Sequence, residues 1–129
     1  MAKFTFVGGI HPYDGKALSK DKPIREILPG SEAVYPLSQH IGAPAAPIVA
    51  KGDRVLVGQR IGESGGFVSA PIHTSVSGTV KAIEPRRVAT GDMVTSIIVE
   101  NDGLYEEIAF KPLENPEKRS REEIIGAIR

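Results

Sequence analysis

Short apolar runs separated by glycine, proline and aspartate occupy the middle of the chain, from Ala33 to about Phe110. The runs cover residues 33–37, 48–49, 55–57, 60–61, 67–68, 79–83 and 95–100. Short strands separated by turn residues at this spacing are typical of an all-β sandwich or barrel. We therefore predict a mostly β fold, with residues 34–112 forming the sandwich domain.

Residues 1–33 have a different pattern and are interpreted as an N-terminal arm that packs on the sandwich. Residues 3–7 alternate apolar and polar positions, which favours a short strand ended by Gly8 and Gly9. Residues 13–22 are polar and predict a loop. Residues 23–28 are compatible with one helical turn or with an extended segment, and the sequence does not choose between them.

The C-terminal residues predict a linker followed by a helix. Residues 111–119 are polar and contain two prolines, and Ser120 with Glu123 forms a capping box. Ile124, Ile125 and Ile128 would line one helical face. An isolated helix of about nine residues is marginal in water. One interpretation is that this helix is the end of the domain and docks on it. The interpretation that we favour is that residues 113–129 are a linker and the start of a helix that leads to a further domain.

Composition narrows the possible chemistry. The chain has no cysteine, which excludes disulfides, thiolate-bound metals and cysteine nucleophiles. Its formal net charge of +0 gives no electrostatic reason to expect a nucleic acid as partner. No stretch approaches the roughly 20 apolar residues that span a bilayer, and the start lacks the apolar segment of a signal peptide. A cytoplasmic location is therefore expected.

No residues in the chain predict a catalytic, cofactor-binding or metal site. His11, His40 and His73 lie in three separate segments without zinc-site spacing, so solvated or hydrogen-bonded histidines are expected. The glycines at 8–9 and 62–66 lack the downstream residues of a phosphate-binding loop or a dinucleotide fingerprint.

One motif, V-A-x-G-D-x-V, occurs at residues 49–55 and again at residues 88–94. Glycine tolerates positive φ, and aspartate can hydrogen-bond the backbone beyond it, so each copy predicts a turn. The offset is about half the length of a small quasi-symmetric sandwich, although two similar turns can arise by chance. The two copies and the segment between them contain the predicted structural turn residues, which are Gly52, Asp53, Gly58, Gly78, Gly91 and Asp92.

The first copy continues into a longer ordered pattern over residues 49–83. G-D-x-V-x-x-G-Q-x-I, then A-P, then S-G-T-V resembles the barrel-sandwich hybrid of biotinyl and lipoyl carrier domains. In those carriers a lysine at the tip of the intervening hairpin holds the cofactor. The interval 60–77 has no lysine here, and residues 64–69 are Ser-Gly-Gly-Phe-Val-Ser. We therefore expect the fold of a carrier domain without the lysine to which a cofactor would be attached.

Longer segments carry a more specific resemblance. Residues 8–12 (G-G-I-H-P), 36–45 (P-L-S-Q-H-I-G-A-P-A), 52–59 and 69–80 together resemble the amino-terminal region of the C subunit of the Rnf electron-transport complex, the RnfC family. The resemblance runs over nearly the whole chain. It implies a peripheral protein at the cytoplasmic face of the membrane, in a complex that couples NAD and ferredoxin redox chemistry to ion transport.

The same resemblance implies that the parent protein binds FMN, NADH and two [4Fe-4S] clusters, with none of these cofactors in residues 1–129. The chain is then a non-catalytic structural and docking module. Its partners are the remaining domains of the parent protein and other Rnf subunits, without membrane insertion, and its candidate interface residues are Gly9, His11, Pro12 and His40. The alternatives are the matching domain of the A subunit of sodium-translocating NADH:quinone reductase and a free-standing lipoyl-like binding module. An independent enzyme is disfavoured because no nucleophile, metal cluster or phosphate loop is evident.

Overall fold

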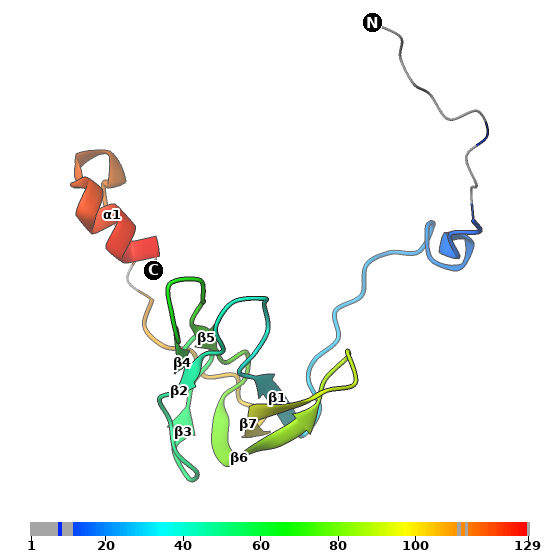
Figure 1. Cartoon of the computed structure of the whole chain (residues 1–129), viewed down its shortest axis with the longest axis horizontal. Helices are drawn as coiled ribbons and strands as arrows, with labels where there is room; N and C mark the ends of the chain where they lie inside the picture. Colours follow the sequence, from blue (N-terminus) through cyan, green and yellow to red (C-terminus); the bar gives the residue numbers. More distant parts are fainter. Residues whose placement is uncertain (1–7, 9–11, 111, 113, 129) are drawn as a thin grey trace, which may run out of the picture.

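The computed structural model describes residues 8, 12–110, 112 and 114–128 (Figure 1). Two antiparallel sheets face each other. The first has the strand order β1 (Glu32–Pro36), β7 (Met93–Asn101), β6 (Gly78–Arg87) and β3 (Arg54–Val55), and the second has the order β2 (Ala46–Pro47), β4 (Arg60–Glu63) and β5 (Ile72–His73). The predicted barrel-sandwich architecture is thus confirmed. The strand expected at residues 3–7 lies outside the described residues.

The β6–β7 hairpin is the longest pairing in the sandwich. Its register runs from Gly78 opposite Asn101 to Arg87 opposite Met93, with an irregularity between Val80 and Ala82. Strand β1 joins the other edge of β7, and its register places Glu32 opposite Glu100. Because side chains alternate between the two faces of a strand, one face of β7 contributes to the core and the opposite face lies away from it.

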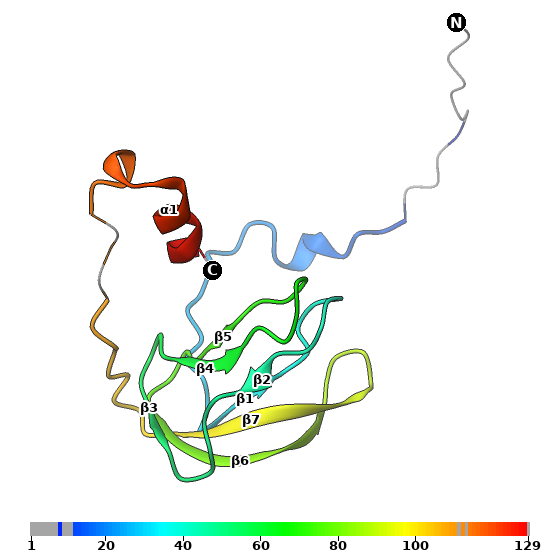
Figure 2. The ribbon, with the colours of Figure 1, turned by 60° about the vertical axis from the view of Figure 1, so that its left-hand side comes forward.

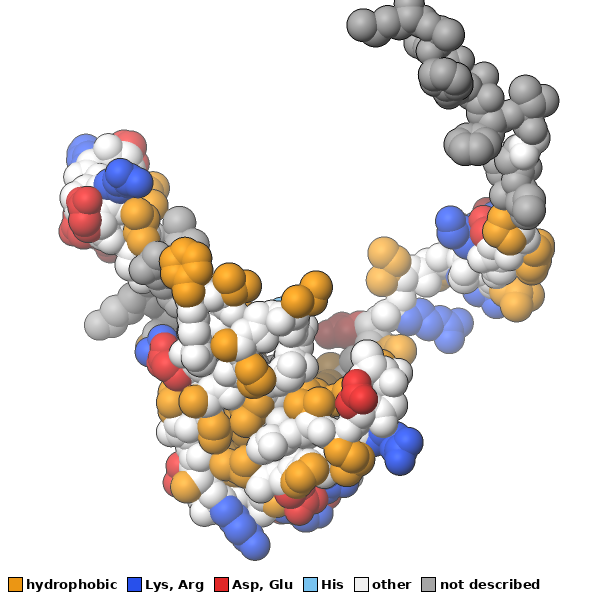
Figure 3. All heavy atoms as spheres, viewed as in Figure 1, with side chains coloured by type: hydrophobic (Ala, Val, Ile, Leu, Met, Phe, Trp, Pro, Cys, Tyr) orange, Lys and Arg blue, Asp and Glu red, His pale blue; other side chains and the backbone are white. Residues whose placement is uncertain are grey.

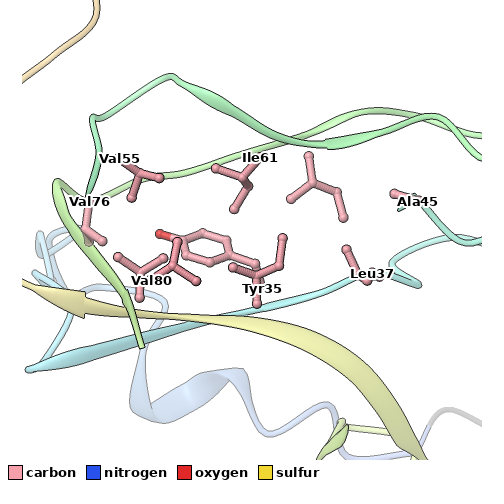
Figure 4. Packing of buried hydrophobic residues seen from close by; sticks show 10 residues of the cluster. Tyr35, Leu37, Ala45, Val55, Ile61, Val76 and Val80 are labelled. Carbon is pink, nitrogen blue, oxygen red and sulfur yellow. The ribbon is translucent and has the colours of Figure 1, made fainter. Parts of the chain in front are cut away.

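The hydrophobic core lies between the two sheets (Figure 4). Val55, Ile61 and Val80 are almost completely buried there. Figure 4 shows Val55 and Ile61 facing Tyr35 and Val80 across the interior. The core residues are Tyr35, Leu37, Ala45, Val55, Ile61, Ile72, Val76, Val80, Ile97 and Val99. Full burial of one such aliphatic side chain stabilises the fold by about 1.5–3 kcal/mol, so this cluster is the main source of stability.

Tyr35 brings a polar group into this apolar interior, and its hydroxyl is satisfied by the segment after β5. The amide of Ser75 donates to the Tyr35 hydroxyl oxygen at 3.0 Å. The Thr74 Oγ1 atom lies 3.0 Å from the same oxygen. A buried hydroxyl without such partners would destabilise the fold. These bonds therefore connect β1 of the first sheet to the end of β5 in the second.

The two copies of V-A-x-G-D-x-V form turns with the same glycine conformation, because φ is 96° at Gly52 and 94° at Gly91. Their hydrogen bonds differ. The Asp53 amide donates to the Ala50 carbonyl at 3.1 Å, whereas the Gly91 amide donates to the Val88 carbonyl at 2.9 Å. The first turn precedes β3, and the second closes the β6–β7 hairpin. The motif therefore marks shared turn chemistry at two different places in the topology.

Two predicted strand pieces are wrong. Residues 48–49 follow β2, whose Ala46 and Pro47 pair with β4. Residues 67–68 lie in a bend that is exposed to solvent. The preceding Gly65 and Gly66 allow the backbone to turn there, and none of the strands in the described residues pairs with this segment. Two apolar residues in a row are thus not enough to predict a strand, because they do not indicate whether a partner strand lies beside them.

The described part of the N-terminal arm runs away from the sandwich (Figure 1). All of residues 12–30 are exposed, so they do not show the expected packing on the sandwich. They contain one 3-10 helix, η1 (Lys16–Leu18), within the predicted loop, and residues 23–28 are neither helix nor strand. Hydrogen bonds to the sandwich begin just before β1, where Asn101 donates to the carbonyls of Gly30 and Ser31.

The C-terminal segment contains η2 (Pro116–Lys118) and α1 (Arg121–Ile128). The predicted capping box is confirmed, because the Ser120 amide donates to Glu123 Oε2 at 2.8 Å and the Glu123 amide donates to Ser120 Oγ at 3.2 Å. The bond from the Ser120 amide holds the carboxylate beside the helix start, and the Ser120 amide and hydroxyl lower the pKa of Glu123. None of the helices in the described part of the chain is long and apolar enough to cross a membrane.

Candidate functional site

Of the four predicted interface residues, the structure places only His40 within the sandwich. Gly9 and His11 lie outside the described residues, and Pro12 is exposed in the arm. His40 lies in a loop, residues 38–45, beside a second loop, residues 64–71 (Figure 2). These two loops are called the tip. The second loop occupies the interval in which a carrier domain would hold its modified lysine.

Hydrogen bonds join the two loops of the tip at several points. The Ala43 amide donates to the Val68 carbonyl at 2.9 Å. Ser69 Oγ donates to the Ala43 carbonyl at 2.8 Å and accepts from the Gly65 amide at 3.0 Å. The loops are therefore held to each other through backbone groups as well as side chains, which restricts their movement.

His40 adds one more bond between the loops. The Ala70 amide donates to His40 Nε2 at 3.1 Å. The imidazole ring therefore links its own loop to the backbone of the second loop. This histidine thus has a positioning role at the tip, in agreement with the expectation of a hydrogen-bonded side chain.

Two glycines allow the loops to approach this closely. A Cβ atom at Gly42 would lie 1.9 Å from the Val68 carbonyl oxygen, and one at Gly65 would lie 1.9 Å from the Pro44 carbonyl oxygen. Both distances are far below van der Waals contact. The backbone arrangement of the tip therefore requires glycine at positions 42 and 65.

The tip presents apolar side chains to solvent. The exposed fractions are 108% for Ile41, 99% for Phe67 and 66% for Val68. Figure 3 shows hydrophobic side chains projecting from this end of the sandwich. A shallow hollow of about 500 Å³ beside them is lined by residues 40–42 and 68–70. Exposed apolar groups that gather on a rigid support are typical of an interaction site.

The tip also lacks formal charge. Residues 38–45 and 64–71 contain no lysine, arginine, aspartate or glutamate, although charged residues make up 25% of the chain. Depletion of charge around aromatic and aliphatic anchors is the composition of an interface core. Ile41, Phe67 and Val68 were not predicted as site residues from the sequence, and the two charge-free segments were the signal that could have indicated them.

A separate polar cluster fixes the chain where it leaves the sandwich. Arg54 Nη1 lies 3.0 Å from Asp102 Oδ2, and its Nη2 lies 2.8 Å from Glu106 Oε2. Ser77 Oγ donates to Asp102 Oδ1 at 2.6 Å and accepts from the Glu106 amide at 3.0 Å. The Ser77 bond, the Leu104 amide and the Arg54 guanidinium lower the pKa of Asp102. The cluster thus holds residues 102–106 against β3 and against Ser77, the residue that precedes β6.

The remaining predicted turn residues have backbone roles. The Gly58 amide donates to the Thr74 carbonyl at 2.8 Å, with φ of 82° at Gly58. At Gly78, a Cβ atom would lie 1.9 Å from the Glu100 carbonyl oxygen of the paired strand. The carboxylate of Asp53 accepts from the Ala50 amide at 2.8 Å, and that of Asp92 accepts from Thr90 Oγ1 at 2.8 Å. All of these side chains and turns shape the scaffold.

The residues present do not fit a thiolate-bound iron–sulfur cluster, which is one of the groups that the family resemblance implies for the parent protein. A thiolate-bound iron–sulfur cluster has no ligand, because the chain contains no cysteine. Within residues 12–110 and the described C-terminal segment, no group of three or more histidine, aspartate or glutamate side chains is placed to hold a metal ion. Gly65 and Gly66 lead into a bend, so they offer no helix N-terminus to a phosphate group.

Comparisons with known proteins agree with this architecture. The chain is 51% identical over 100 residues to the C subunit of the Na⁺-translocating ferredoxin:NAD⁺ oxidoreductase complex of Acetobacterium woodii, covering 78% of this chain and 23% of that protein. It is 42% identical over 127 residues to the C subunit of the proton-translocating ferredoxin:NAD⁺ oxidoreductase complex of Clostridium ljungdahlii, covering 97% of this chain and 28% of that protein.

A third relative is the C subunit of the ion-translocating oxidoreductase complex of Haemophilus influenzae, 36% identical over 128 residues, covering 97% of this chain and 20% of that protein. The chain therefore spans between a fifth and somewhat more than a quarter of the length of these relatives. The profile of the family described as RnfC barrel sandwich hybrid domain matches residues 4–104. The chain thus belongs to the RnfC barrel sandwich hybrid domain family.

Proposed function

We propose that the chain is the docking module of the RnfC protein in an ion-translocating ferredoxin:NAD⁺ oxidoreductase complex, at the cytoplasmic face of the membrane. The observation that carries the proposal is the tip, where a rigid and charge-free pair of loops exposes Ile41, Phe67 and Val68. The names of the relatives support the choice of complex, since each is the C subunit of such an ion-translocating oxidoreductase.

The tip also supports a structural role in place of a carrier role. A carrier needs a mobile arm on a lysine so that its cofactor can visit separate sites. Here the corresponding loop has Phe67 in a segment without lysine, and hydrogen bonds from Ala43 and Ser69 tie it to the neighbouring loop. An apolar side chain on loops that are held together in this way suits a stable contact, and it supplies no group for covalent transfer.

The redox cofactors belong, in this proposal, to other segments of the full-length protein. FMN, NADH and two [4Fe-4S] clusters would be bound by the part of the polypeptide that the relatives have beyond the matched region. The absence of cysteine from the chain supports this division. Absorption spectra test it: the full-length protein should show flavin and iron–sulfur bands, and the 129-residue chain should show neither. Stoichiometric flavin on the short chain would contradict the division.

Co-purification tests membership of the complex. The full-length protein that contains this chain would carry an affinity tag in its own host, and solubilised membranes would be passed over the matching resin. We expect the other subunits and NAD⁺-dependent oxidation of reduced ferredoxin to elute with the tag. A host strain with the untagged protein is the control. Elution of the tagged protein alone, without the activity, would refute the proposed function.

A further inference from the structure

We infer that the tip inserts into an uncharged, apolar pocket on another protein subunit, with Phe67 as the central anchor. The inference rests on the proposed function and specifies the partner of the same site. It commits to a protein pocket, whereas a lipid surface and a segment of the same polypeptide are outcomes that would overturn it.

The first support is the size and exposure of the anchors. Phe67 and Ile41 project fully into solvent, and Val68 is about two-thirds exposed. A large aromatic side chain carries more apolar surface into a contact than any aliphatic neighbour, and residues of this type at the centre of an interface account for most of its affinity. A projecting anchor of this kind needs a concave partner, because a flat surface would leave most of the ring in water.

The second support is the rigidity of the tip. The Ala43 amide, Ser69 Oγ and His40 Nε2 each take part in a bond that joins the two loops. The tight glycine contacts at Gly42 and Gly65 leave no space for the loops to move closer together. A surface that already has its bound conformation loses little conformational entropy on association. The tip is thus built to bind without rearrangement.

The third support is the charge pattern, which favours protein over membrane. Segments that dock on anionic lipid use clusters of lysine and arginine beside their apolar residues, and residues 38–45 and 64–71 have neither. The charged side chain that precedes the second loop is Glu63, which would be repelled by such a surface. A partner pocket must be similarly free of unpaired charge, because a charge buried against these apolar groups would be strongly unfavourable.

Photo-crosslinking in the assembled complex identifies the occupant. Phe67 would be replaced by p-benzoylphenylalanine, an aromatic residue of related shape, in the full-length protein, and the cross-linked peptides would be sequenced by mass spectrometry. The matched control carries the same probe at Leu104, which is 66% exposed and lies outside the tip. We expect cross-links from position 67 to an uncharged apolar stretch of one other subunit, and no such cross-links from position 104.

Each other result would overturn the inference. Cross-links to lipid would assign the tip to the membrane, cross-links within the same polypeptide would make it an internal contact, and a yield no higher than at Leu104 would show a free surface. Failure of the proposed function itself is distinguishable, because the wild-type tagged protein would then not co-purify with the complex at all.

Variants measure how much the anchor contributes. Phe67→Ser in the full-length protein should weaken its reassociation with the stripped complex roughly 30-fold or more, as at an interface hot spot. The control, Met93→Ser, changes a side chain that is 60% exposed in β7 and should alter the affinity less than about twofold. Since Phe67 is fully exposed, its variant should unfold at the wild-type urea concentration. Equal affinities for the two variants would overturn the inference.

Discussion

The glycine at position 42 offers a direct test of how the tip is held together. In Gly42→Ala the new Cβ atom would lie 1.9 Å from the Val68 carbonyl oxygen, where carbon–oxygen contacts in real proteins are at least 3.0 Å. The two loops must therefore separate by about 1.1 Å, the difference between these distances. The Ala43 amide, now 2.9 Å from the same oxygen, would move to about 4.0 Å and lose its hydrogen bond.

The expected cost follows from that loss. A net hydrogen bond contributes about 0.5–1.5 kcal/mol, and the displaced loops add strain, so we expect the free energy of unfolding to fall by about 1–2 kcal/mol. With a urea dependence near 2 kcal/mol per molar, the unfolding midpoint should fall by about 0.5–1 M. Far-ultraviolet circular dichroism of the 129-residue chain in urea measures the midpoint, and amide hydrogen exchange at Ala43 reports the broken bond.

Gly30→Ala is the matched control. A Cβ atom at Gly30 meets nothing within 4 Å, and its φ lies outside the positive range. This variant should unfold within about 0.2 M urea of the wild type, because exposed substitutions away from special contacts change stability little. Gly65→Ala should behave like Gly42→Ala, since its Cβ would meet the Pro44 carbonyl oxygen at 1.9 Å. Equal midpoints and equal Ala43 exchange in Gly42→Ala and Gly30→Ala would refute the proposed rigidity of the tip.

Three further predictions concern the scaffold. Ile97→Ala, at a fully buried position of the core, should lower the free energy of unfolding by about 2–5 kcal/mol in urea titrations, and a loss below about 1 kcal/mol would contradict the assigned packing. The pKa of Asp102 is lowered in the folded state, so its contribution to stability is present above its unfolded pKa and is lost as the pH falls through the folded value. Melting temperatures of Asp102→Asn should therefore fall less than those of the wild type on acidification below about pH 4, and parallel pH curves would contradict the cluster. Gly126→Ala, inside α1 with nothing within 4 Å of its Cβ, should stabilise the helix by about 1 kcal/mol and increase the helical circular dichroism signal, whereas an unchanged signal would argue against α1.

The polar cluster around Arg54 fixes the segment that follows β7. Arg54 contacts Asp102 and Glu106, and Val57 forms an isolated bridge with Glu107. Residues 102–108 are thereby held along one side of the sandwich before the linker begins. This anchoring gives the residues after Ile108 a defined starting point on the sandwich.

Local features of the sequence predicted the parts of the molecule that depend on neighbouring residues. The capping box of Ser120 and Glu123 forms as expected because both hydrogen bonds join residues three positions apart. The turn before Met93 was evident from Gly91 and Asp92, since positive φ is a property of one residue. The predicted strands at residues 33–37, 79–83 and 95–100 were found because their apolar runs are several residues long.

The sequence by itself thus determined a β-rich scaffold of the carrier type, without cysteine and without a lysine in the interval that would hold a cofactor. Only the tertiary structure decided that residues 38–45 and 64–71 meet, and that Phe67 faces water in a bend where the apolar run had predicted a strand. The pairing of β1 with β7 and the contact between the two loops join residues far apart in the chain. Burial and exposure depend on such distant neighbours, so periodicity in a short window carries no information about them.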